Sequence, residues 1–251
     1  MQIEKTNIQN FLAISDFVSL LNMSSGFLSI ICSINHNFEL AAILMIIAIM
    51  FDSIDGWVAR KTNRQDDLGF GKNIDSLSDA ISFGAAPAVF IYTTINTTSF
   101  ALQLIVILIS LLIVVCGVLR LTRYNVIADH IKISGFIGFP IPGISLVLAT
   151  YYLSGLYNSY IALILSIIVS LLMVSNIKYP KFSNMPIITI SCILIVLIIL
   201  PIPTTIYNIN VPALILLLFC LYYLISNLIK KWDQLLLLIK LTIYNLLKRS
   251  I

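Results

Sequence analysis

Residues 51–84 read FDSIDGWVARKTNRQDDLGFGKNIDSLSDAISFG and place six aspartates between two apolar stretches. The chain around them has 251 residues, of which 59% are hydrophobic and 10% charged, with a mean hydropathy of +1.02. Soluble domains carry about 25% charged residues. Apolar runs recur along the whole length, so the sequence predicts an integral membrane protein in which these aspartates need a specific explanation.

Eight apolar segments follow one another, and each is long enough to span a membrane, since about 17 residues can cross a hydrocarbon core. They lie near 16–34, 39–61, 71–95, 101–122, 138–156, 161–177, 187–203 and 210–229. We therefore predict an all-α integral membrane protein with about eight transmembrane helices, six of them forming its core. The expected divisions are an N-terminal interfacial helix at 1–15, a main membrane domain at 16–186, an additional transmembrane helix pair at 187–229 and an amphipathic tail at 230–251.

Lysines and arginines are confined to one side of this arrangement. The loops after segments 1, 3, 5 and 7 contain none, and all fifteen basic residues fall on the other side. Because positively charged residues favour cytoplasmic loops, we expect both termini and the aspartates to face the cytoplasm in a multi-pass protein of the cell membrane. The net charge of +4 is small and its basic residues are scattered, so no nucleic acid partner is expected.

Four of the six aspartates are predicted to share one site, whereas the other two belong to a solvated loop. Asp52 and Asp55 are three residues apart, and Asp75 and Asp79 are four apart, so each pair lies on one helix face. The short connection between segments 2 and 3 makes them antiparallel neighbours, which brings the four carboxylates to one depth. Their charge needs compensation, and oxygen ligands suit a hard divalent cation: Mg²⁺, Mn²⁺ or Ca²⁺. A carboxylate site for Mg²⁺ usually also binds substrate phosphates, which points to phosphate chemistry at the membrane surface.

Small residues accompany the aspartates. Gly56 and Ala59 leave one side of the second segment without bulk, so a flat group could approach the helix backbone closely. Arg60 lies one turn beyond and could bind a phosphate oxygen with its guanidinium fork. Gly71 lies four residues before Asp75 and therefore on the same face of the predicted helix. The alternative reading is that the glycines and alanine only allow close helix packing, as is common in membranes.

The combined spacing, Asp-x2-Asp-Gly-x2-Ala-Arg followed by Gly-x3-Asp-x3-Asp, resembles the signature of the CDP-alcohol phosphotransferases. Those enzymes displace CMP from a CDP-linked lipid with an alcohol. One difference is that ten residues separate Arg60 from Gly71, where the family usually has about eight. A spacing of eight residues after Arg60 would make Gly69 the second glycine of the signature, and Asn73 would then stand where the third aspartate is expected. We therefore choose Gly71 and place a two-residue insertion in the exposed loop, where insertions are tolerated.

The resemblance implies a role for each of these residues and makes 16–186 the catalytic domain. Asp52, Asp55 and Asp75 would hold a pair of divalent cations, Mg²⁺ or Mn²⁺, with Asp79 helping. Asp79 would also be the general base that takes the proton from the attacking hydroxyl. A homodimer is implied as well. The residues expected to bind the CDP-lipid are Asn22, Gly56, Ala59, Arg60 and Gly71.

Further stretches resemble the phosphatidylserine synthase branch of that family, over roughly residues 11–182. They include LLNMSSGFLSI (20–30), DSLSDAISFGAAPA (75–88), LRLTRYNV (119–126) and GFIGFPIPG (135–143). This implies L-serine as the acceptor and a CDP-activated diacyl or archaeol-type lipid, CDP-diacylglycerol or CDP-archaeol, as the donor. Arg120 and Arg123 would bind the serine carboxylate or, alternatively, only anchor the topology. Asn22, an amide within the first segment, either supports the nucleotide site or joins two helices.

Two other functions compete with this interpretation. A sibling enzyme could use glycerol phosphate or an inositol phosphate, but a phosphorylated acceptor would call for a more basic pocket. An ion-coupled transporter could also use membrane carboxylates. A transport path would need polar residues through the full depth of the segments, whereas the outer halves here are almost wholly apolar.

Overall fold

The computed structural model describes residues 7–62, 69–128, 135–180, 185–200, 205–226 and 228–229. Every predicted apolar segment forms a helix there, which confirms an all-α membrane protein, and two pairs of two-residue strands are added to it. The helices are η2 (Ile8–Asn10), α1 (Ile14–Ile34), α2 (Phe38–Lys61), α3 (Phe70–Asp79), η3 (Ala80–Ala85), α4 (Ala86–Thr94), α5 (Phe100–Ala128), α6 (Pro142–Leu153), α7 (Ser159–Val174), α8 (Met185–Ile199) and an unlabelled last helix, Val211–Ser226. The antiparallel strand pairs are β1 (Phe136–Ile137) with β2 (Lys178–Tyr179) and β3 (Thr205–Ile206) with β4 (Ile209–Asn210).

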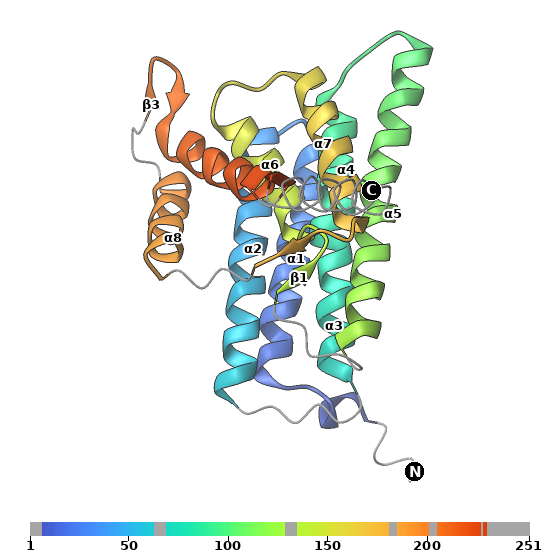
Figure 1. Cartoon of the computed structure of the whole chain (residues 1–251), viewed down its shortest axis with the longest axis vertical. Helices are drawn as coiled ribbons and strands as arrows, with labels where there is room; N and C mark the ends of the chain where they lie inside the picture. The colour runs from blue at the N-terminus through green and yellow to red at the C-terminus, as the bar shows by residue number, and fades with distance from the viewer. Residues whose placement is uncertain are drawn as a thin grey trace, which may run out of the picture.

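The long helices run side by side along the long axis of the molecule, as Figure 1 shows for α1, α2, α3 with α4, and α5. By length and composition, Ile14–Ile34, Phe70–Thr94 and Phe100–Ile127 could each cross a membrane, and shorter apolar helices accompany them. The helix α8 lies at the left edge in Figure 1, and the last helix runs obliquely from the β3–β4 hairpin toward the bundle. Of the predicted interfacial helix, residues 7–13 contain only the η2 turn; residues 1–6 and the predicted tail at 230–251 lie outside the described residues.

Helix α1 turns its small residues inward and its large ones outward. Its buried residues are mostly serines, with Gly26 and Asn22 among them, whereas Phe17, Phe27 and Leu28 are exposed. Such a pattern suits a lipid environment, where close approach between helices, rather than burial of apolar surface, holds them together. Helix α2 packs along this small-residue side of α1.

A proline interrupts the third predicted span without ending it. Pro87 has no N–H, and its ring clashes with the carbonyl four residues earlier, so α-helical bonding cannot continue past it. The chain forms the π-helical segment η3, in which the N–H of Ala86 donates to the carbonyl of Ile81, five residues back. One extra residue in a turn rotates α4 relative to α3 by about 100°.

Arg123, near the end of α5, forms hydrogen bonds to the chain segments before and after α6. Arg123 donates Nη1 to the Val174 carbonyl (2.9 Å) and Nη2 to the carbonyls of Ile137 (2.8 Å) and Met173 (2.9 Å). Gly138 makes this close approach possible: its φ of 81° is left-handed, and an added Cβ would lie 3.0 Å from the Met173 carbonyl carbon. The β1–β2 pair is therefore held against the C-terminal ends of α5 and α7.

Candidate active site

The aspartates gather where α2 ends and α3 begins. Because α2 and α3 both pack against α1, the inward faces of the two antiparallel helices meet at one level. Single carboxylate oxygens of Asp52, Asp55 and Asp75 lie within 4.8 Å of one another. Asp79 is outside that trio but its carboxyl is a hydrogen-bonding neighbour of Asp52. Asp55 and Asp79 are each only 6% exposed, whereas Asp52 and Asp75 are half-buried, so the cluster concentrates negative charge at the edge of the protein interior.

Helix α1 supplies hydrogen-bond donors to this cluster. Ser19 donates Oγ to Oδ2 of Asp55 at 2.8 Å, and Asn22 donates Nδ2 to Oδ1 of Asp79 at 3.1 Å. The two donors are three residues apart, so they lie on one face of α1. Asn22 had been predicted from the sequence, whereas Ser19 had not. The signal that could have revealed Ser19 is the run of small polar residues repeating every three or four positions along α1.

The trio of oxygens fits a divalent cation. Oxygens bound to one Mg²⁺ lie about 2.1 Å from it and thus up to about 4.2 Å apart, close to the spacing of Asp52, Asp55 and Asp75. All three donors are hard carboxylate oxygens, which favour Mg²⁺ or Mn²⁺ over metals that prefer sulfur or imidazole. The acidic cluster can therefore bind a metal ion.

The residues predicted to bind the nucleotide lie around the C-terminal end of α2 and the N-terminal end of α3. Arg60 is exposed and folds back over Gly56, where an added Cβ would lie 3.4 Å from its Nη1. Ala59 is half-buried one turn along, and Gly71 is buried in the first turn of α3. Gly69, the alternative in counting the loop, has a φ of 70° at the N-cap of α3, so it serves as the turn residue that starts the helix.

Asn22 joins two helices, which is one of the two readings that the sequence left open. Its amide nitrogen joins α1 to α3 through Asp79, and its Oδ1 is fully buried without a hydrogen-bond partner among the described residues. A buried acceptor without a donor is costly, by about 1–3 kcal/mol. The oxygen therefore favours a ligand that brings its own donor.

The two arginines of α5 occupy different surroundings. Arg120 is 6% exposed, and its Cζ lies 5.4 Å from the ring centroid of Tyr124 and 5.7 Å from that of Phe136. Its Nε has no partner in the described part of the chain, and its charge acts on Asp52 and Asp79. Arg123 instead donates its guanidinium hydrogens to the backbone carbonyls of Ile137, Met173 and Val174. The structure thus brings only Arg120 to the aspartates.

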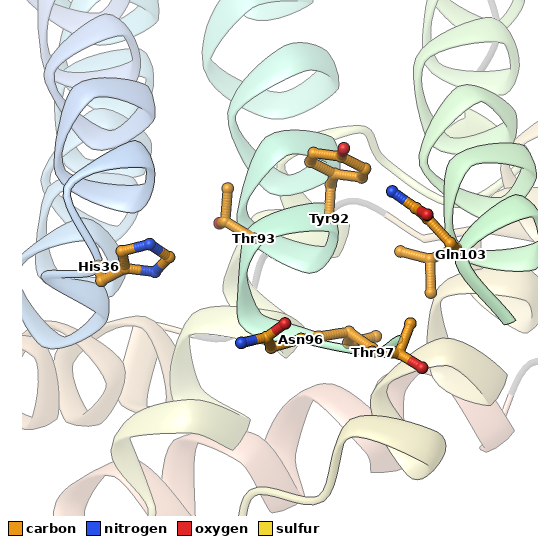
Figure 2. Close-up of a pocket in the computed structure, with 8 residues that line it drawn as sticks. His36, Tyr92, Thr93, Asn96, Thr97 and Gln103 are labelled. Carbon is orange, nitrogen blue, oxygen red and sulfur yellow. The ribbon is translucent and has the colours of Figure 1, made fainter. Parts of the chain in front are cut away.

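A separate pocket lies at the other end of the bundle. It has a volume of about 320 Å³ and is lined by neutral polar groups of His36, Tyr92, Asn96, Thr97 and Gln103, together with Thr93, Ile95 and Val106 (Figure 2). None of these lining residues is acidic, and the pocket belongs to the ends of α1, α4 and α5 that point away from the aspartates. It has no part in the acidic site.

Comparison with protein families assigns the chain to a class. The model for CDP-alcohol phosphatidyltransferase matches residues 12–174, a range that contains the four aspartates, their α1 donors and both α5 arginines. The chain therefore belongs to the CDP-alcohol phosphatidyltransferase family.

Individual relatives narrow this class. Archaetidylserine synthase of Methanothermobacter thermautotrophicus is 49% identical over 178 residues, which cover 71% of this chain and 74% of that protein. CDP-diacylglycerol–serine O-phosphatidyltransferase of Methanocaldococcus jannaschii is 38% identical over 225 residues, covering 89% of this chain and 96% of that protein. The protein of the same name from Bacillus subtilis is 35% identical over 169 residues, or 66% of this chain and 89% of that protein.

The geometry predicts which acids bind a metal. Changing Asp52, Asp55 or Asp75 singly to Asn should weaken Mn²⁺ binding by at least roughly tenfold, the loss that removal of even an outer-shell partner typically causes. Binding would be measured on purified protein by electron paramagnetic resonance of free Mn²⁺. The matched control is Glu39→Gln, the same loss of charge at the exposed opposite end of α2. Unchanged affinity in all three aspartate variants would refute the metal site.

Proposed function

We propose that this protein transfers a phosphatidyl or archaetidyl group from a CDP-activated lipid to the hydroxyl of L-serine, releasing CMP, as a step of phospholipid biosynthesis. The observation that carries the proposal is the trio of clustered carboxylates with the buried Asp79 beside it, in a chain whose relatives carry the names of serine-lipid synthases. Membership in a transferase family argues against the ion-coupled transporter.

The divalent cations would be Mg²⁺ or Mn²⁺, a pair as the family resemblance implies, held by Asp52, Asp55 and Asp75 with Asp79 helping. When bound, they neutralise charge on the diphosphate and on the leaving phosphate. The protein's own contribution is to fix those carboxylates: Ser19 orients Asp55 through its 2.8 Å hydrogen bond, and Asn22 orients Asp79.

Asp79 is proposed as the general base. Its Oδ1 is held by Asn22, which fixes the plane of the carboxylate, and the carboxylate would accept the proton of the serine hydroxyl in exchange for its contact with Asp52. The serine oxygen forms a bond to the phosphorus that carries the lipid, while the bond from that phosphorus to the bridging oxygen breaks. The bridging oxygen leaves with CMP, so charge and atoms balance.

The donor lipid would lie with its nucleotide over the unobstructed side of α2. Gly56 and Ala59 present little bulk there, and Arg60 is exposed and free to swing from Gly56 onto a phosphate oxygen. Gly71, which is buried, adds no side chain to the facing turn of α3. The unpartnered Oδ1 of Asn22 would accept a hydrogen bond from the bound donor or acceptor.

The serine carboxylate is assigned to Arg120. Its guanidinium is buried beside the neighbouring rings of Tyr124 and Phe136, which limits its orientation, and its Nε is left with a hydrogen to donate. Arg123, the other predicted ligand, would have to release three backbone carbonyls to reach a substrate. We therefore propose that Arg123 supports the pocket by holding Ile137, next to Phe136, in place.

Orientation and assembly follow from the sequence and the family resemblance. The one-sided distribution of Lys and Arg supports an active site and termini in the cytoplasm of a multi-pass cell-membrane protein. A fluorescent reporter fused to the C-terminus should therefore mature, whereas a periplasmic phosphatase reporter there should stay inactive. A homodimer is proposed from the resemblance, and the mass of the detergent-solubilised protein would test it.

The decisive assay offers purified protein a panel of acceptors. With CDP-diacylglycerol or CDP-archaeol, L-serine should give CMP and a serine lipid, and chelation of divalent cations should stop the reaction. Glycerol phosphate and inositol phosphate serve as the competing acceptors. CMP release with either of these and none with serine would overturn the serine assignment while leaving the transferase chemistry intact.

Asp79→Asn should lower kcat by at least about 100-fold, because an amide cannot take the proton from serine. The change keeps the size of the side chain, and Mn²⁺ binding should persist in part because Asp52, Asp55 and Asp75 remain. Both quantities would be measured on the same preparation. Near-normal turnover would contradict the base role.

Arg120→Ala should raise the KM for serine by roughly 10- to 100-fold, the loss expected for a hydrogen bond between charged groups, with a smaller effect on the KM for the CDP-lipid. Arg60→Ala should instead raise the KM for the CDP-lipid more than the KM for serine, because that side chain is proposed to contact the phosphates. Steady-state kinetics with each substrate varied in turn would measure both. Equal effects of Arg120→Ala on the two KM values would rule out a specific carboxylate contact.

A further inference from the structure

The π-helical segment η3 begins at the residue that follows Asp79. Its buried residues are Ser82, Phe83 and Gly84. π-Helical turns inside α-helices are rare and occur frequently at functional sites. The position of η3 therefore raises the question of what it contributes to Asp79.

Ser82 connects η3 to α1 at the place where α1 contacts Asp79. Its Oγ donates to the backbone carbonyl of Asn22 at 2.9 Å, while the side chain of Asn22 donates to Asp79 at 3.1 Å. One residue of α1 is thus bonded through its backbone to η3 and through its side chain to the carboxylate. Asn22 and Asp79 cannot change their relative positions without breaking one of these bonds.

Gly26 brings the two helices close enough for this arrangement. A Cβ added at Gly26 would lie 2.5 Å from Cα of Ser82 and 2.7 Å from its Cβ. These are distances that non-bonded atoms do not adopt, and the Cα atom belongs to the backbone, so a side chain here would push η3 away from α1. Gly26 is one helical turn after Asn22 and therefore sets the spacing at which Ser82 reaches its carbonyl.

Ser145 of α6 completes the support of η3 from the other side. The Ser82 carbonyl has lost both nearby helical donors, because the N–H of Ala86 bonds to Ile81 and Pro87 has no N–H. The Oγ of Ser145 donates to this carbonyl at 3.2 Å, and both serines are fully buried. The hydrogen bond that the π turn leaves unmade is therefore supplied by a third helix.

We propose that η3 is a positioning device for the reaction, in which Gly26, Ser82 and Ser145 fix α3 against α1 so that Asn22 holds Asp79 in its productive orientation. These are positioning residues, because they act through Asn22 and Asp79 and do not contact the substrates. The inference rests on the proposed function, since it takes Asp79 as the base, and it adds residues that the Asp, Gly and Arg signature does not contain.

Two variants test the device. Ser82→Ala removes the donor to the Asn22 carbonyl with little loss of volume, and Gly26→Ala separates η3 from α1. We expect kcat to fall roughly tenfold in Ser82→Ala and about 100-fold in Gly26→Ala, the scale of loss that follows a displacement of about 1 Å at a reacting group. The affinity for Mn²⁺ should fall by much less than kcat, because Asp52 and Asp55 belong to α2 and only Asp75 of the three proposed metal ligands lies on α3.

The matched control is Ser29→Ala. Ser29 is also fully buried, and its Oγ also donates across helices to a backbone carbonyl, that of Ala41 at 2.8 Å, but it lies on the far half of α1. Its loss should lower the melting temperature about as much as Ser82→Ala does, with kcat per folded molecule unchanged. If Gly26→Ala fails to fold, the comparison of Ser82→Ala with Ser29→Ala carries the test alone.

The possible results of these measurements test the positioning role of η3 and the base role of Asp79 separately. Normal kcat per folded molecule in Ser82→Ala, with only the melting temperature reduced, would show that η3 is ordinary packing and would overturn the inference. A fall in Mn²⁺ affinity equal to the fall in kcat would overturn it too, because the metal ligands rather than Asp79 would then have moved. Normal kcat in Asp79→Asn would refute the base role itself, and with it the proposed function of that residue.

Discussion

Four carboxylates, two of them buried, are gathered at one end of an apolar helix bundle and repel one another, and the surrounding structure is organised by the need to hold them there. Water is largely excluded from Asp55 and Asp79, so their charges cannot be screened by solvent. Within the described residues, the protein compensates only in part, with hydroxyl and amide donors from α1 and with the buried cation Arg120. The remaining negative charge makes the site suited to a divalent cation.

The helix packing follows from the same constraint. A carboxylate cluster on α2 and α3 needs a third helix close enough to reach it with short side chains, and α1 meets that need by lining its inner face with serines and one glycine. Serine is suited to both tasks, since it is small enough for close approach and carries a donor. The large side chains of α1 are then left for the outer face, which is the reverse of the distribution in a soluble helix.

The sequence predicted the features that depend on local periodicity. The apolar runs located the helices, and the spacings of three and four residues placed Asp52 with Asp55 and Asp75 with Asp79 on common faces. It also selected Gly71 over Gly69 in the longer loop, and the left-handed φ of Gly69 explains why that glycine is a turn residue instead. What it could not predict are contacts between distant segments. Pro87 disfavours regular α-helical hydrogen bonding. Only the packed structure shows that Ser145 donates a hydrogen bond to the Ser82 carbonyl beside it. Arg123 looked equivalent to Arg120 because the folding of residues 135–138 onto the end of α7 has no local signature.

The anchoring of Arg123 has an electrostatic consequence. Its three hydrogen-bond partners are backbone carbonyls, which are dipoles without net charge, so the contacts hold the guanidinium in place but leave its positive charge unneutralised by them. A fixed cation one helical turn from Arg120 adds to the positive potential that α5 contributes near the site. The site thus has carboxylates on α2 and α3 and a buried guanidinium on α5. A zwitterion whose ammonium and carboxylate face in opposite directions would be aligned by that field before it makes its first direct contact.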